Sequence, residues 1–216
     1  MQDPHGLCGV VLAAGESSRM GSDKALLPWP PPAPGAEPPR STLLSAGILA
    51  LEPHTRVVVV VAGKNADLIA TTVAACAAYM VRNPDPDRGQ FSSLQIGLRA
   101  VFDHGCDSAI ITPVDCAPLA PSSLVLLCTS FQSAVAQNLW AVAPENNGKH
   151  GHPLLVSREL IRLFLDAPVA SNARDILHAH ADRVEYVAVP DDLSHADIDT
   201  PKEYALRTEK ALPPAS

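Results

Sequence analysis

A chain of 216 residues is long enough for one α/β domain with a sizeable buried core. Its 16 basic and 23 acidic residues give a formal net charge of −7, which disfavours binding to nucleic acid or to an anionic membrane, because phosphate groups attract basic surfaces. No apolar run is long enough to span a membrane, and the N-terminus lacks the basic region of a signal peptide. The five cysteines lack C-x-x-C spacing, which is typical of reduced thiols, so we expect a cytoplasmic protein.

The apolar run over residues 7–13 predicts a buried parallel strand that ends in a loop of small residues. Ligands of open α/β sheets bind just outside the carboxyl ends of such strands. The Ala-Ala-Gly sequence at 13–15 leaves room for a flat ligand against the backbone. The loop amides, Arg19 and Lys24 supply donors and positive charge for a polyphosphate. The alternative is an ordinary strand–loop–helix joint with two unrelated basic residues.

Seven of the thirteen residues over 28–40 are proline, which excludes a helix or a central strand there. We interpret this segment as a stiff surface insertion. The alternative is a polyproline II ligand for a partner domain.

Helical and strand patterns alternate through the rest of the chain. Thr200 is predicted to cap the last helix, with Pro201 in its first turn and Glu203 in capping-box position. We predict strands over 56–62, 79–82, 107–114, 139–144 and 184–189. Helices are predicted up to residue 51 (capped by Ser41 or Thr42) and over 65–78 (capped by Asn65), 121–137, 160–165 and 200–210, with one more beginning at Ser92 and one at Ser171 or Asn172. This order predicts a three-layer α/β/α, Rossmann-like domain with a mostly parallel sheet over 1–210, followed by a tail at 211–216.

Two serines stand where the turn-rich segment after Asn83 gives way to a helical pattern. Ser92 and Ser93 at a helix N-terminus combine hydroxyls with free N–H groups, which can hydrogen-bond a ligand. A plain N-cap is the alternative, because serine is favoured at that position in any helix.

Asp115 directly follows the apolar strand over 107–114. A carboxylate there, close to a bound triphosphate, suits Mg²⁺, which prefers carboxylate and phosphate oxygens. A solvated aspartate in a turn is the alternative. Farther along the chain, Asp197 and Asp199 alternate in an extended stretch, so only one of them can face a site.

His150 and His152 have the spacing of a histidine pair, but no cysteine or carboxylate follows at the usual distance for a transition-metal site. We therefore expect the Gly-His-Pro turn at 151–153 to line a substrate pocket.

Two familiar nucleotide motifs, G-x-G-x-x-G and G-x-x-x-x-G-K-[ST], are absent from the chain. A dinucleotide dehydrogenase and a P-loop ATPase are therefore disfavoured.

Five segments together resemble one enzyme family. The segment L-A-A-G-x-S-x-R-M-G-x-x-K at 12–24 resembles the N-terminal signature of the MobA-like NTP transferases, which include molybdenum-cofactor cytidylyltransferase. The segment N-P-x-x-x-x-G-x-x-S-S-L-x-x-G-L at 83–98 is similar to the family's second nucleotide loop. The P-V-D-C-A-P segment, the Gly-His-Pro turn and the D-I-D-T-P-x-x-Y segment follow in the family's order. The resemblance implies a fold of the nucleotide-diphospho-sugar transferase type.

The resemblance also implies roles for individual residues, which fall into groups by what they would contact. Mg²⁺ would be held by Asp115 and Asp199. The acceptor would be held by His152 and Arg174. Catalysis would depend on Arg19, Lys24 and Asp115, and the nucleotide would contact Leu12, Ala13, Ala14, Gly15, Ser17, Arg19, Lys24, Ser92 and Ser93.

The activity implied is Mg²⁺-dependent transfer of a nucleoside monophosphate from an NTP to a phosphorylated acceptor, with release of pyrophosphate. Molybdopterin is the favoured acceptor by the resemblance. CTP is favoured over GTP, because the guanylyl-transferring relatives carry a Gly-Gly pair where this chain has Ala-Ala-Gly at 13–15.

The chain departs from the family at 169–172, where Val-Ala-Ser-Asn replaces G-D-x-G before the Ala-Arg pair. A sugar- or polyol-phosphate nucleotidyltransferase is therefore one alternative, and a catalytically silent nucleotide-binding carrier is another. An acceptor enzyme or chaperone is a further expected partner.

Overall fold

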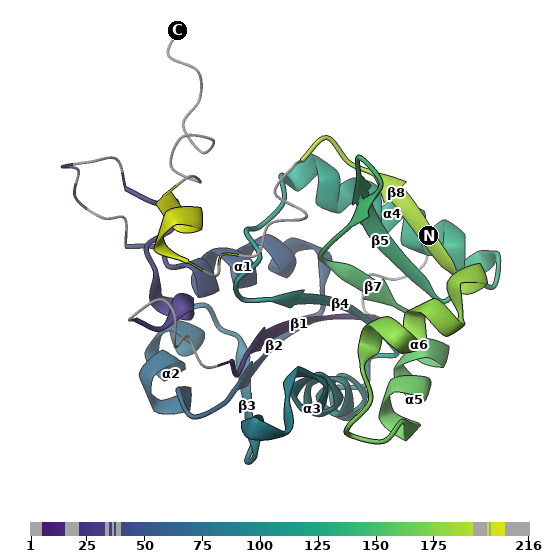
Figure 1. Cartoon of the computed structure of the whole chain (residues 1–216), viewed down its shortest axis with the longest axis horizontal. Helices are drawn as coiled ribbons and strands as arrows, with labels where there is room; N and C mark the ends of the chain where they lie inside the picture. The colour runs from purple at the N-terminus through teal and green to yellow at the C-terminus, as the bar shows by residue number, and fades with distance from the viewer. Residues whose placement is uncertain are drawn as a thin grey trace, which may run out of the picture.

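Runs of valine and isoleucine form the centre of a mixed eight-stranded sheet (Figure 1). The computed structural model describes residues 6–15, 22–32, 35, 37, 40–191, 198 and 200–205. Within these ranges the sheet order is β3-β2-β1-β4-β7-β5-β6, with β8 paired to β5. The strands are β1 (Leu7–Ala13), β2 (Val57–Ala62), β3 (Tyr79–Arg82), β4 (Ser108–Pro113), β5 (Ala141–Asn146), β6 (Lys149–His150), β7 (Leu154–Val156) and β8 (Val184–Ala188).

The sheet is mostly parallel, as predicted. Strands β3, β2, β1 and β4 are parallel to one another, and β8 is parallel to β5, whereas β7 pairs antiparallel with both β4 and β5. Both faces of the central strands are buried, which explains why their sequences are continuously apolar. The predicted α/β fold class is confirmed.

Helices cover both faces of the sheet and give the three predicted layers. Val10 and Leu12 of β1 belong to the core on one face, and Val11 and Ala13 to the core on the other. The first face is covered by α3 (Gln90–Asp103), α5 (Arg158–Asp166) and α6 (Ala173–Ala179), which lie below the sheet in Figure 1. The second is covered by α1 (Leu43–Leu51), α2 (Ala66–Ala75) and α4 (Pro121–Ala136).

Helix α3 approaches the sheet closely at Gly97. A Cβ atom at this position would lie 2.7 Å from Cγ1 of Val10 and 2.9 Å from Cγ2 of Val61. Glycine therefore sets the distance between α3 and the strands that lead to the candidate site.

Several predicted boundaries are wrong for identifiable reasons. Helix α3 begins at Gln90 because Gly89, at φ 94°, is its N-cap, so the alternative in which Ser92 caps the helix is also wrong. Helix α2 ends at Ala75 and not at 78, since Ala77 adopts a left-handed φ of 53°. The predicted strand over 139–144 continues to Asn146 as β5 and forms a hairpin with β6, whose loop residues, Asn147 and Gly148, both have positive φ.

The start of the last helix is confirmed. Glu203 N donates to Thr200 Oγ1 at 3.3 Å, and Thr200 N donates to Glu203 Oε2 at 2.8 Å, which together form the predicted capping box.

All five cysteines are free thiols, and burial raises the pKa of Cys8 to about 12 and that of Cys128 to about 11. In the described part of the chain, no helix has the length and apolarity needed to cross a membrane.

Candidate active site

The carboxyl ends of β1 and β4 lie side by side. Leu12 pairs with Pro113, and Val114 N donates to Leu12 O at 3.0 Å. The small residues that follow β1 and the aspartate that follows β4 therefore leave the sheet at the same edge. This is the edge where open α/β sheets bind ligands.

Lys24 and Asp115 meet at this edge. Lys24 begins the short 3₁₀ helix η2 (Lys24–Leu26), and its Nζ donates to Asp115 Oδ2 at 3.2 Å. The two side chains are 13% and 27% exposed, so the ion pair is accessible to a small ligand from one side. The contact brings together two residues that the sequence assigned separately to a phosphate site and a metal site.

Asp23 and Asn65 fix the backbone from which Lys24 extends. Asp23 Oδ1 accepts a hydrogen bond from Ala25 N at 2.9 Å. Asn65 Nδ2 donates to Asp23 Oδ2 at 2.8 Å and to Ala13 O at 3.0 Å, which ties the start of η2 to the end of β1. Asn65 stands before α2 as predicted, but its side chain does not cap that helix. Sequence reasoning missed this role, and the available signal was the position of Asn65 just beyond β2.

Ser92 and Ser93 lie in the first turn of α3, where both are buried. Asn83 Nδ2 donates to Oγ of each serine at 2.9 Å, and Ser92 Oγ donates to Gly89 O at 2.7 Å. Among the described residues, Ser93 Oγ accepts from Asn83, and the residue is 4% exposed. Asn83 is a second positioning residue that the sequence analysis did not identify.

Asp115 offers one carboxylate oxygen to a ligand. Its Oδ2 accepts from Lys24, while Oδ1 has no hydrogen-bond partner in the part of the chain that the structure describes. Its backbone carbonyl accepts from Ile198 N at 3.0 Å, so Ile198 lies directly beside it. The predicted second metal ligand, Asp199, and its alternative, Asp197, lie outside the described residues.

The structure describes some of the other predicted site residues and not others. Leu12, Ala13 and Ala14 are buried at the end of β1 and Gly15 is exposed beyond them, whereas Ser17 and Arg19 lie outside the described residues. Over the described ranges, no group of three or more His, Cys, Asp or Glu side chains is placed to hold a metal ion. The predicted acceptor residues are His152, which is partly buried, and Arg174, which is exposed at the start of α6.

His150 stands next to β8. Its ring stacks on Tyr186 with the ring centroids 3.5 Å apart, and its Nε2 lies 3.9 Å from Glu145 Oε2. This packing accounts for the histidine at 150 without a metal.

The MobA-like NTP transferase domain matches residues 9–184. The chain belongs to this family of nucleotidyltransferases. It is 27% identical over 205 residues to the molybdenum cofactor cytidylyltransferase of Escherichia coli K12, covering 93% of this chain and 95% of that protein. It is 29% identical over 201 residues to a probable molybdenum cofactor guanylyltransferase of Mycolicibacterium paratuberculosis, covering 93% and 94%. The crystal structure of Rv0371c from Mycobacterium tuberculosis has the same fold, with a TM-score of 0.75 at 23% identity and coverage of 94% and 98%.

Family membership confirms the resemblance and the class of activity that it implied. The two curated relatives differ in the nucleotide that their names give, at nearly equal identity to this chain. The choice between CTP and GTP therefore depends on the residues of the site.

Proposed function

We propose that this protein transfers cytidine monophosphate from CTP to molybdopterin and releases pyrophosphate. The observation that carries the proposal is the Lys24–Asp115 pair at the shared carboxyl edge of β1 and β4. An ammonium and a carboxylate at one point can together hold a metal–triphosphate complex, because the ammonium binds the phosphates and the carboxylate binds the metal ion. A phosphate oxygen of the acceptor would attack the α-phosphorus, and the bond from that phosphorus to pyrophosphate would break.

Lys24 stabilises the negative charge that develops on the phosphate oxygens during this step. The Asp23–Asn65 contacts hold the backbone that carries Lys24, and its ammonium already contacts Asp115, so little reorganisation is needed when the substrate binds. Phosphoryl transfer depends mostly on positioning and electrostatics, so the proposed mechanism uses no protein nucleophile. Arg19 remains part of the proposal as a second cation on the nucleotide.

Asp115 fits a role as a magnesium ligand. Mg²⁺ usually takes one or two carboxylates and completes its shell with water and substrate phosphates, and the Oδ1 atom of Asp115 is available for this. When bound, the ion would supply further positive charge to the phosphates. We propose Asp199 as the second ligand, since the preceding residue, Ile198, is hydrogen-bonded to Asp115. Rv0371c, which shares the fold, has been crystallised in complex with manganese.

CTP is favoured by the first nucleotide segment. Ala13 and Ala14 stand where the guanylyl-transferring relatives carry a Gly-Gly pair, and both are buried at the end of β1. The Ser93 hydroxyl, held by Asn83, supplies a donor to the nucleotide.

Thermal melting tests the choice of CTP, because a ligand at 100 times its dissociation constant stabilises the folded protein by about 2.7 kcal/mol. We expect a larger shift with CTP and Mg²⁺ than with GTP and Mg²⁺, and the reverse order would contradict the choice of CTP.

The acceptor is proposed to bind near His152 and Arg174, with an acceptor enzyme or chaperone as a further partner in the cytoplasm. A sugar- or polyol-phosphate acceptor is the second candidate, and the Val-Ala-Ser-Asn sequence at 169–172 favours it over a typical family member. Arg174 N donates to Asn172 Oδ1 at 2.8 Å, so the replaced loop caps α6 directly.

Pyrophosphate release tests the proposed function. The protein is incubated with Mg²⁺, each of the four NTPs and a panel of acceptors that includes molybdopterin and several sugar phosphates. We expect pyrophosphate with CTP and molybdopterin. Release with a sugar phosphate alone would support the second candidate, and nucleotide binding without release for any acceptor would indicate a silent carrier.

A further inference from the structure

His150 and Tyr186 form a flat aromatic surface next to the Gly-His-Pro turn. Their ring centroids are 3.5 Å apart and their planes differ by 12°, so the two rings are nearly parallel and overlap almost completely. Among the described residues, the other aromatic pairs are tilted by 38° or more. Tyr186 is 36% exposed and the side chain of His150 is 46% exposed. Because each ring uses one face in the stack, this exposed area lies on the outer faces and edges of the rings.

The aromatic pair lies at the ligand-binding edge of the sheet. Strand β7 is antiparallel to both β4 and β5, and β8 is parallel to β5, so the carboxyl ends of β4, β5 and β8 are at the same edge. His150 pairs with Glu145 near the carboxyl end of β5, and Tyr186 is on β8. Since β5 is two strands away from β4, about 10 Å separates them. A small molecule with its phosphate near Asp115 could therefore extend to the two rings.

The rings also lie on the face of the sheet that α3 covers. Ala143 of β5 belongs to the core on this face, and it is the register partner of Tyr186. Glu145 is two residues beyond Ala143, so its side chain is on the same face, and His150 is directly opposite Glu145. The first turn of α3 carries the two serines proposed to contact the nucleotide. A ligand on the aromatic pair would therefore lie on the same side of the sheet as a bound nucleotide, as the second substrate of a transfer reaction must.

The residues around the pair suit a heterocyclic ring. Glu145 Oε2 lies 3.9 Å from His150 Nε2, so a carboxylate at the edge of the stack can accept hydrogen bonds from ring N–H and amino groups. The turn beyond His150 is held against β5, because Gly151 N donates to Pro144 O at 3.0 Å. The predicted acceptor residue His152 is part of this turn.

We propose that His150 and Tyr186 bind the acceptor by stacking on its pterin ring, while the acceptor phosphate lies near Asp115. Molybdopterin joins a flat pterin to a phosphate, so one molecule carries both groups. The inference rests on the proposed nucleotidyl transfer, because that reaction supplies the need for a second substrate at this edge. A sugar phosphate has no flat aromatic ring, so this surface favours the pterin acceptor over the second candidate.

Fluorescence of 6-hydroxymethylpterin, which lacks the reacting phosphate, tests the surface directly. Saturating CTP and Mg²⁺ are present throughout, so that the probe cannot report on the nucleotide site. We expect saturable quenching, because stacking on an aromatic side chain quenches the pterin. Y186A should weaken binding of the probe by at least about fivefold, as expected for loss of one stacking ring. Y186F keeps the ring and should bind as the unsubstituted protein does. Absence of saturable quenching, or equal binding by Y186A, would overturn the proposal.

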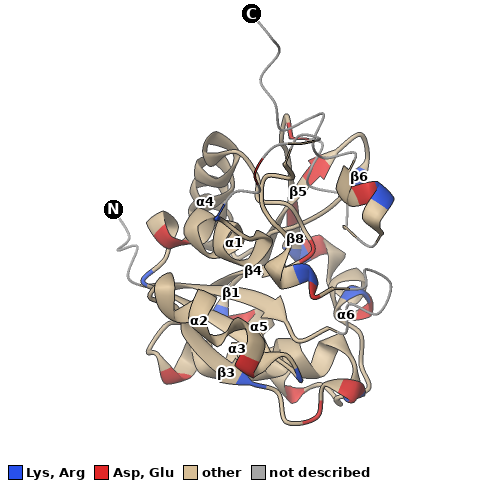
Figure 2. Ribbon diagram, turned by 90° about the vertical axis from the view of Figure 1, so that its left-hand side faces the viewer, with Lys and Arg blue, Asp and Glu red and all other residues tan. Residues whose placement is uncertain are grey.

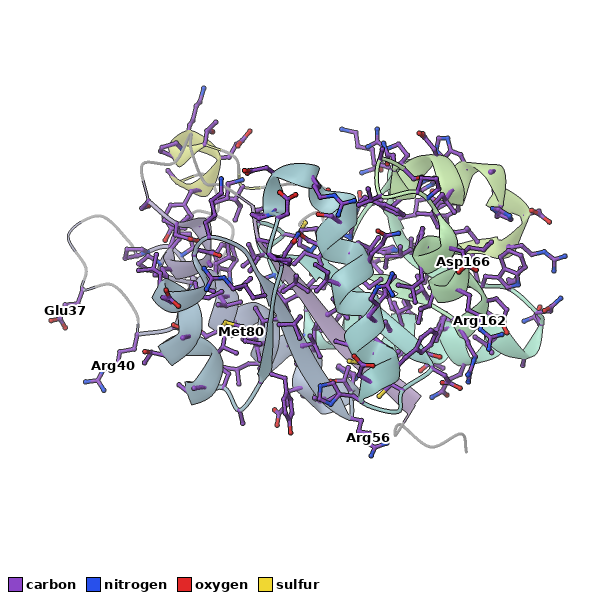
Figure 3. The ribbon with its side chains drawn as sticks, turned by 90° about the horizontal axis from the view of Figure 1, so that it is seen from below. Glu37, Arg40, Arg56, Met80, Arg162 and Asp166 are labelled. Atoms are coloured by element: carbon purple, nitrogen blue, oxygen red, sulfur yellow. The ribbon has the colours of Figure 1, made fainter. Side chains whose placement is uncertain are left out.

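Y79A is the matched control. Tyr79 contacts His104, with the ring centroids 4.6 Å apart, but it lies on β3, at the opposite end of the sheet from β8. Figure 3 shows its neighbour Met80 well separated from Asp166, which ends α5. We expect Y79A to bind the probe normally. Equal weakening by Y79A and Y186A would mean that the probe binds exposed tyrosines in general, which would also overturn the proposal.

Kinetics with molybdopterin then test the link to the acceptor. Y186A should raise the acceptor KM by at least about fivefold and leave the KM for CTP unchanged. The melting temperature of Y186A should stay close to that of the unsubstituted protein, because Tyr186 is exposed. An unchanged acceptor KM would overturn the proposal. Absence of pyrophosphate release by the unsubstituted protein would instead contradict the proposed function, and the fluorescence titration would still test the aromatic surface.

Discussion

Lys24 and Asp115 are 91 positions apart in the sequence, and their side chains form an ion pair with 3.2 Å between Nζ and Oδ2. A partly exposed pair of this kind stabilises a fold by only about 1 kcal/mol or less. Folding alone therefore gives little reason to bring these two charges together. The proposed function does, because a metal–nucleotide complex would give each group a partner of opposite charge.

Substitution of Lys24 by alanine should separate chemistry from folding. Without the ammonium to neutralise phosphate charge, we expect the turnover of Lys24→Ala to fall by two to three orders of magnitude, about the loss seen when one charge-stabilising donor is removed. The free energy of unfolding should fall by about 1 kcal/mol or less. Arg56→Ala, at the opposite end of the sheet, is the control and should keep full turnover. A large loss of stability in Lys24→Ala would favour a structural role for the lysine.

Substitution of Asp115 by asparagine should change the response to Mg²⁺. The amide keeps the size of the side chain but binds the cation more weakly than a carboxylate. We expect the Mg²⁺ concentration for half-maximal turnover to rise at least tenfold. Asp103→Asn, at the far end of α3, serves as the control. An unaltered Mg²⁺ titration in Asp115→Asn would exclude this residue as a ligand.

Asn83 should affect nucleotide binding through the two serines that it holds. Its amide is 3% exposed, so Asn83→Ala leaves buried groups without a partner and should cost about 1–3 kcal/mol of unfolding free energy. We also expect weaker CTP binding, measured by calorimetry. Ser157→Ala removes another buried hydrogen-bonding group, at the start of α5 and next to Arg158, which lies over Phe102 near the other end of α3, and controls for general destabilisation. Equal CTP affinity in all three proteins would contradict a positioning role for Asn83.

Two glycine substitutions should have opposite effects on stability. Gly97→Ala places a methyl group within 3 Å of Val10 and Val61, which should destabilise the protein by about 1–3 kcal/mol. Gly47→Ala in α1 meets nothing within 4 Å and should stabilise by about 0.5–1 kcal/mol through helix propensity. Urea denaturation measures both. Similar effects of the two variants would show that α3 is not closely packed against the sheet.

Much of the fold was predictable because the central strands are continuous apolar runs. The β5–β6 hairpin was not, since Asn147-Gly148 stands among polar residues that resemble a plain loop. Strand β7 was missed because three residues, Leu154–Val156, carry no periodicity. The start of α3 depended on the positive φ of Gly89, which competes with the preference of serine for the N-cap.

The candidate site was predictable as two separate ends of strands, but not as contacts. Lys24 and Asp115 were each identified from the segment that carries them, whereas their meeting depends on β1 lying next to β4. The roles of Asn65 and Asn83 depend on hydrogen bonds between segments distant in sequence. Figure 2 shows that the acidic and basic residues are scattered along the described part of the ribbon, so charge alone does not mark the site.

Transfer of the α-phosphate of CTP tests the central claim most directly. The protein is incubated with Mg²⁺, molybdopterin and CTP labelled in its α-phosphate, and the label is followed by chromatography. We expect the label to appear on molybdopterin in amounts equal to the pyrophosphate released, and to be absent with Lys24→Ala. Pyrophosphate release without labelled molybdopterin, or equal transfer by Lys24→Ala, would contradict the account.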